Sequence, residues 1–179
     1  MFGYDWPRLH AALNDLPAAL LFVTVLFDLA GWITKRPTLR AAALWMLWAG
    51  VVGGWAAVVA GLQAEDAVDH GPAIHELLEQ HETQALVTMS VFTVVLVYKL
   101  FRRANLRPVE ELVQGVLSVF GFVGILWTAA IGGKLAFEHA AGVTTAAMQT
   151  EIQDRAKQTH HHHGEEGDST HDHDADHEH

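Results

Sequence analysis

The sequence predicts an all-α protein: a four-helix transmembrane bundle followed by a disordered, His/Asp/Glu-rich C-terminal tail. Two observations support this fold class. Residues 1–143 are strongly apolar and include two uncharged runs of 22 residues, whereas a helix of a soluble protein keeps a polar stripe. Residues 160–179 contain no large apolar side chain and cannot bury a core. The uncharged runs therefore argue against the alternative, a soluble α-bundle with unusually buried helices.

Four runs are apolar enough to cross the bilayer, which takes about 20 residues in a helix. They cover residues 16–33, 41–62, 83–101 and 112–136. The first is interrupted only by Asp28, near the end of its span, for which we expect a structural salt bridge or an interfacial position. The third is short, but the stem of Lys99 can lie along apolar surface while its charge stays in water. These four spans define a predicted bundle over residues 1–143.

Two further segments follow the bundle. Residues 144–159 have the pattern of a short amphipathic linker helix. The alternation of His and Asp in residues 160–179 is typical of segments that bind transition-metal ions weakly at many sites. An expression tag or a solubilising acidic tail is the alternative. The candidate tail ligands are His160, His161, His162, His163, His171, His173, His177 and His179.

Lysine and arginine are concentrated in the two short loops between spans one and two and between spans three and four. Because basic loops stay in the cytoplasm, both loops are predicted to be cytoplasmic. Both termini and the 63–82 loop are then predicted to face outward, into the periplasm, with the chain in a bacterial inner membrane.

Composition excludes several classes of function. The net charge of −10 argues against a nucleic-acid partner, which requires a basic face. The absence of cysteine excludes disulfides and thiolate metal sites. The sequence shows no nucleophile–base pair, phosphate-binding loop or acid/base dyad, so we do not predict an enzyme.

The histidines of the bundle region all fall on the predicted outer side. They are His10, His70, His75, His81 and His139. The 72–84 segment should be helical and continue into the third span, with Pro72 near its start. At about 100° per residue, His75 and His81 then point to different sides of this helix, and we expect His81 to face the bundle.

Imidazoles from separate helix ends can hold a metal ion or a haem iron. We therefore predict His10, His81 and His139 as ligands of haem b or of a Zn, Cu or Ni ion. Four further residues would either replace one of these ligands or hydrogen-bond to them: Asp15, His75, Glu79 and Glu138. The competing interpretation is that these are solvated polar residues at a lipid interface, because no fixed ligand spacing is present.

Two segments carry a resemblance to a known family, LHAALNDLPAALL at 9–21 and IGGKLAFEHAAGV at 131–143. They resemble the entry motif (His-Pro…His-Phe-Pro) and the exit motif (Gly-Gly-x-Leu-x-Tyr-x-His-Gly) of a family of bacterial four-span membrane proteins. The matching residues are His10, Pro17, Gly132, Gly133, Leu135 and His139. The departures are Ala11 for proline, Asp15 for a second histidine, Phe137 for tyrosine and Ala140 for glycine. Some members are fused to Rieske or cytochrome c modules, so the resemblance implies an electron-transfer role.

Three functions are compatible with the sequence. The first is a histidine-lined metal or haem site at the outer face, serving electron transfer with a redox protein or membrane-complex partner. The second is binding, buffering or export of transition metals by means of the tail. The third is a structural subunit of a membrane complex without a site of its own. In each case the lipid bilayer surrounds the chain, which could also form a homo-oligomer.

Overall fold

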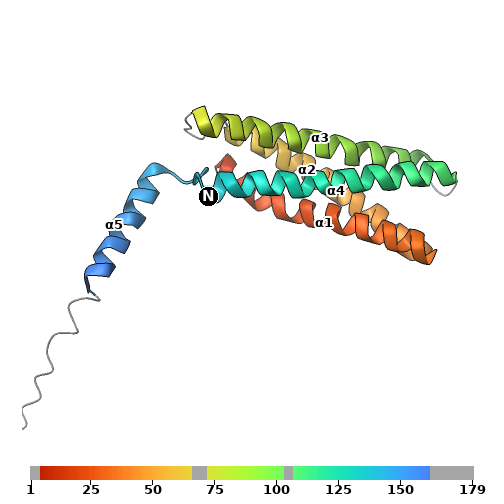
Figure 1. Ribbon diagram of the computed structural model, residues 1–179, viewed down its shortest axis with the longest axis horizontal. Coiled ribbons are helices and arrows are strands. Elements are labelled where there is room, and N and C mark those ends of the chain that lie inside the picture. Colours follow the sequence, from red (N-terminus) through yellow and green to blue (C-terminus); the bar gives the residue numbers. More distant parts are fainter. Residues whose placement is uncertain (1–4, 66–71, 103–106, 162–179) are drawn as a thin grey trace, which may run out of the picture. The chain divides into compact units, whose positions relative to one another are not determined.

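The computed structural model describes residues 5–65, 72–102 and 107–161, and this part of the chain is helical. Helices α1 (Trp6–Thr34), α2 (Pro37–Glu65), α3 (Pro72–Arg102) and α4 (Pro108–Phe137) are each long and apolar enough to span a membrane (Figure 1). A shorter helix, α5 (Thr145–His161), follows them. The predicted all-α fold with four spans is confirmed.

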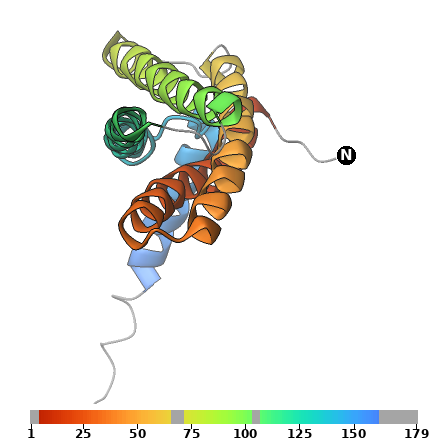
Figure 2. The same ribbon diagram turned by 90° about the vertical axis from the view of Figure 1, so that its right-hand side faces the viewer.

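The four long helices run up and down and form one compact unit, residues 1–142. Helix α1 packs along α2 and α3 packs along α4, while α2–α3 and α1–α4 contacts complete the bundle (Figure 2). One end, here called the basic end, holds the C-termini of α1 and α3 and the N-termini of α2 and α4. The opposite end, here called the histidine end, holds the start of α1 and of α3 together with the ends of α2 and α4.

Helix starts follow simple capping rules. Asp5 caps α1 by accepting a hydrogen bond from the Arg8 backbone N–H at 3.3 Å. Helices α2, α3 and α4 each begin at a proline, whose missing N–H costs little in the first turn. The predicted start of the third helix near Pro72 is confirmed. Helix α1 begins ten residues before the predicted apolar span, so His10, which precedes that span, lies within the helix.

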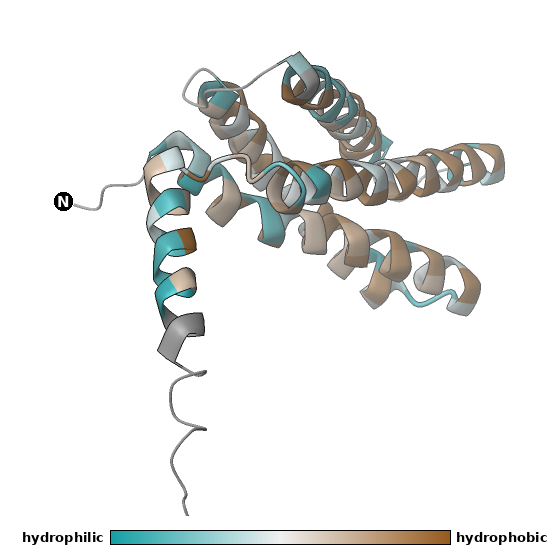
Figure 3. Cartoon of the chain, turned by 60° about the vertical axis from the view of Figure 1, so that its left-hand side comes forward, coloured by the Kyte–Doolittle hydropathy of each residue, from teal (hydrophilic) through white to brown (hydrophobic). Residues whose placement is uncertain are grey.

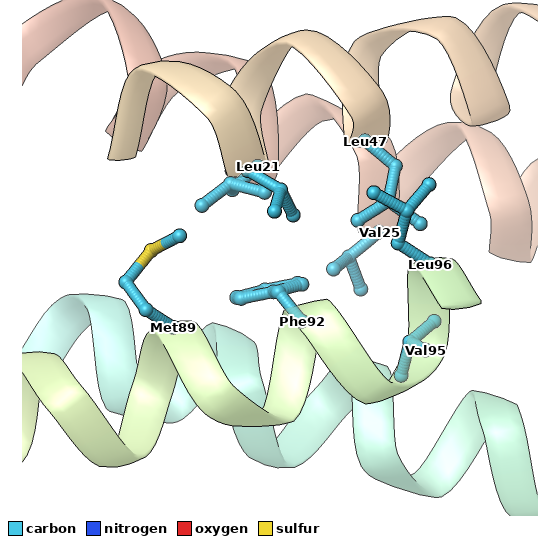
Figure 4. Packing of buried hydrophobic residues seen from close by; sticks show 8 residues of the cluster. Leu21, Val25, Leu47, Met89, Phe92, Val95 and Leu96 are labelled. Carbon is cyan, nitrogen blue, oxygen red and sulfur yellow. The ribbon is translucent and has the colours of Figure 1, made fainter. Parts of the chain in front are cut away.

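The core lies midway along the bundle, where side chains of α1, α2 and α3 interlock (Figure 4). Its buried cluster comprises Leu21, Val25, Leu47, Val51, Met89, Phe92, Val95 and Leu96. Glycines make room for the largest of them: a Cβ at Gly121 would stand 2.8 Å from the Phe92 ring, and one at Gly54 would stand 2.6 Å from Met89. The small-residue runs thus serve close helix packing, as in other membrane bundles.

Hydrophobic residues predominate along the four long helices (Figure 3), and many of their large apolar side chains are exposed, as expected of a lipid-facing surface. Trp45, Phe120 and Trp127 expose 72%, 57% and 62% of their surface in the isolated chain. In contrast, α5 is mainly hydrophilic in the same view. It begins after Thr144, whose hydroxyl accepts a hydrogen bond from the Ala147 N–H, and it belongs to a separate unit, residues 143–179.

Ion pairs join the helices at the basic end. Asp28 of α1 pairs with Lys99 of α3, and both side chains are largely buried. The predicted structural salt bridge of Asp28 is therefore present, with a partner from α3. Two further pairs connect α2 with α4 and α3 with α4: Arg40–Glu111 and Arg102–Glu110, each at 2.8 Å.

Candidate functional site

Two of the three predicted ligands meet at the histidine end. The imidazole rings of His10 (α1) and His81 (α3) lie edge to face, with their centroids 6.3 Å apart and their planes at 88°. Both residues are half-buried. Residues far apart in the chain thus form a histidine pair inside the bundle, and His81, rather than His75, faces inward, as expected for the histidine nearer to the membrane span.

His10 is held by the main chain of α2. Its Nδ1 lies 2.8 Å from the carbonyl oxygen of Ala57. A carbonyl can only accept, so Nδ1 carries the proton and donates it. In the neutral ring, Nε2 then keeps its lone pair. This tautomer, with one N–H fixed by a backbone carbonyl, is the arrangement typical of metal-ligating histidines.

Two glycines form the surfaces on which the rings rest. A Cβ at Gly61 of α2 would stand 3.0 Å from both Cε1 and Nδ1 of His10. A Cβ at Gly132 of α4 would stand 3.1 Å from Cε1 of His81. The rings therefore lie against backbone where a larger residue would displace them. All four helices contribute to the pair.

The His81 side chain is only partly satisfied within the described part of the chain. The backbone carbonyl of Thr128, one helical turn before Gly132, accepts a hydrogen bond from the imidazole. Its Nδ1 is buried and has no hydrogen-bond partner among the described residues. A buried imidazole nitrogen without a partner is unusual in a folded protein. The donor set fits a metal ion, because a neutral imidazole nitrogen is a common ligand of Zn, Cu and haem iron.

The remaining candidates lie outside the pair. His139 follows α4 and is exposed, as are Asp15 and Glu138. His75 is exposed on α3 and its Nε2 lies 3.4 Å from Glu79 Oε1. Among the described residues, no group of three or more His, Cys, Asp or Glu side chains is close enough together to hold a metal ion.

The structure does not test the predicted metal-binding tail. Residues 162–179 are outside the described residues, as are His70 and the side chains of His160 and His161. Metal binding by the tail stays a prediction.

Sequence reasoning missed the residues that support the histidine pair. They are Ala57, Gly61, Thr128 and Gly132. The small-residue run of the second span was a usable signal, because Ala57 and Gly61 lie one helical turn apart on one face of it. A backbone carbonyl that accepts from a side chain on another helix, however, leaves no mark in the sequence.

A bundle of four helices that are long and apolar enough to cross a membrane, with polar groups towards its two ends, defines a class, the multi-span integral membrane proteins. Residues 7–145 match the family of predicted membrane proteins DUF2231, and the chain belongs to this family. No curated protein and no solved structure matches the chain.

Proposed function

We propose that the chain is a membrane-embedded electron-transfer protein that binds haem b or a transition-metal ion between His10 and His81. The observation that carries this proposal is the hydrogen bond from His10 Nδ1 to the Ala57 carbonyl, which leaves Nε2 with its lone pair available. The buried Nδ1 of His81, which has no hydrogen-bond partner among the described residues, supplies a second imidazole nitrogen on the neighbouring ring. A haem iron or a copper ion bound there would supply one-electron redox chemistry.

The separation of the two rings is close to that needed for a shared ion, and because each nitrogen lone pair lies in its own ring plane, binding would also turn the rings out of their edge-to-face arrangement. Metal–nitrogen bonds are about 2.0–2.1 Å long, so two imidazoles on one ion have ring centres roughly 5–6 Å apart. The observed centroid separation of 6.3 Å is close to this range. The protein's contribution would be to hold both rings from rigid helices and to exclude water with the surrounding apolar surface.

His139, Asp15 and Glu138 remain predicted additional ligands. His139 and Glu138 directly follow α4, so a small movement of the chain after Phe137 would change their distance from the pair. His75 and Glu79 are the weaker candidates, because each already has the other as a neighbour on the exposed side of α3.

The test is an optical spectrum combined with metal analysis of the full chain, purified in detergent. We expect about one haem or one metal ion per chain beyond what the tail binds, which the same measurement on a chain without residues 160–179 isolates, and a Soret band if the group is haem. His10→Ala and His81→Ala should each remove most of the bound haem or metal ion, because two ligands from separate helices are needed.

His75→Ala is the matched control, since it removes an exposed imidazole from the same helix as His81. It should leave the bound group unchanged. A colourless preparation without metal, or equal losses in all three variants, would contradict the proposal.

A further inference from the structure

A cavity of about 350 Å³ lies at the basic end, at the turn between α1 and α2. It is lined by Trp32, Lys35, Pro37, Arg40 and Glu111. It lies at the opposite end of the bundle from the histidine pair and shares no residue with it. Variants of its lining residues therefore leave the side chains of the proposed metal or haem site unchanged.

The charges around this cavity are unbalanced. Each described carboxylate of the basic end is already paired: Asp28 with Lys99, Glu110 with Arg102 and Glu111 with Arg40. Lys35, Arg36 and Arg107 are left without a carboxylate partner within the described residues. Of these three cations, Lys35 lines the cavity, so the cavity presents an uncompensated positive charge.

The donors at the cavity suit a phosphate group. Lys35 ends α1 in a left-handed conformation, with φ at 55°, and its ammonium carries three N–H donors. Arg40 donates one N–H to Glu111, and its guanidinium has further N–H donors on a side chain that is 42% exposed. Trp32, 54% exposed, also lines the cavity, and tryptophan is common where helices leave the bilayer.

The surface next to the cavity is apolar. Leu29 and Ile33 of α1, within one helical turn of Trp32, expose 49% and 65% of their surface. A free anion would gain nothing from these side chains, whereas the acyl chains of a lipid would cover them. We infer that this cavity binds the phosphate headgroup of an anionic phospholipid, with Lys35 as its main cation.

Native mass spectrometry of the full chain in detergent tests this inference, with phosphatidylglycerol and phosphatidylcholine as the two probes. We expect the anionic lipid to form the more abundant adduct. Lys35→Asn should lower that adduct about fivefold, since one basic residue near an anionic lipid contributes about that factor. Asparagine tolerates a positive φ better than most residues, so this variant keeps the turn.

Two variants decide between a site and general attraction. Lys35→Arg keeps the charge and should retain the lipid, while Lys134→Gln removes an exposed cation from the histidine end and should have no effect. Equal loss in Lys35→Asn and Lys134→Gln, or no loss in Lys35→Asn, would overturn the inference.

A third arm separates the lipid from free phosphate. Inorganic phosphate added at millimolar concentration should leave the phosphatidylglycerol adduct in place, because it lacks acyl chains. If phosphate displaced the lipid completely, the cavity would be a site for free anions and the inference would be wrong.

Discussion

Ala140 shows how one residue departs from the conformation that its side chain prefers. It follows α4 with φ at 50°, in the left-handed region. The N–H of the next residue, Ala141, donates to the carbonyl of Leu135 at 2.9 Å, a bond across six residues that folds the chain back over the end of α4. The motif that the chain resembles has glycine at position 140, and glycine adopts this conformation without a steric penalty.

Ala140→Gly should therefore stabilise the bundle. A left-handed conformation costs an L-residue roughly 1–2 kcal/mol, and glycine avoids this cost. Glycine also raises the conformational entropy of the unfolded chain, which offsets part of the gain in stability. We expect a net gain of about 0.5–1 kcal/mol, measured as a higher midpoint of thermal unfolding in detergent. Ala136→Gly, in the last turns of α4, should lower the midpoint instead; a lower midpoint for Ala140→Gly too would contradict this account.

At the scale of helices, Gly132 and Gly133 are neighbours in α4 with different surroundings. A Cβ at Gly132 would press on His81, whereas a Cβ at Gly133 would meet nothing within 4 Å. Alanine favours the helix over glycine by about 1 kcal/mol at either position. The difference in stability and site occupancy between Gly132→Ala and Gly133→Ala therefore measures the effect of the contact with the His81 imidazole.

Gly132→Ala should displace His81 and lower the occupancy of the metal or haem site several-fold. Gly133→Ala should leave that occupancy unchanged and raise the thermal midpoint slightly. Metal analysis and the optical spectrum of both purified variants measure the effect. Equal occupancy in the two variants would mean that the position of His81 does not control the bound group.

The helices could be predicted from local periodicity, and the inward side of α3 from periodicity together with the position of His81 nearer to the apolar span. Apolar runs indicated four spans, and a rotation of about 100° per residue separated His81 from His75. The first turns of α1 could not be found in this way, because residues 6–15 are largely polar or small. The partners of Asp28 and His10 come from other helices, and one sequence without its fold does not determine such long-range pairs.

At the scale of the whole molecule, the two ends of the bundle differ in charge and chemistry. The basic end carries the three ion pairs and the unpaired cations, while the histidine end carries the imidazoles. Because lysine and arginine near the spans favour the cytoplasm, we predict that the basic end is cytoplasmic and the histidine end periplasmic.

Single cysteines can test this orientation cleanly, since the chain has none of its own. Gln63→Cys and Thr38→Cys place exposed thiols near opposite ends of α2. In intact cells, a membrane-impermeant maleimide should label residue 63, and it should label residue 38 only after lysis. Labelling of residue 38 in intact cells, without labelling of residue 63, would show that the orientation is opposite to the predicted one.

The most direct test of the central claim is cross-linking of positions 10 and 81 in native membranes. The double variant His10→Cys/His81→Cys should be joined rapidly by a short bifunctional thiol reagent, because both side chains point into the same space between α1, α2, α3 and α4. The pair His10→Cys/His75→Cys should react far more slowly, since residue 75 points away. Equal rates for the two pairs would show that the bundle does not bring residues 10 and 81 together.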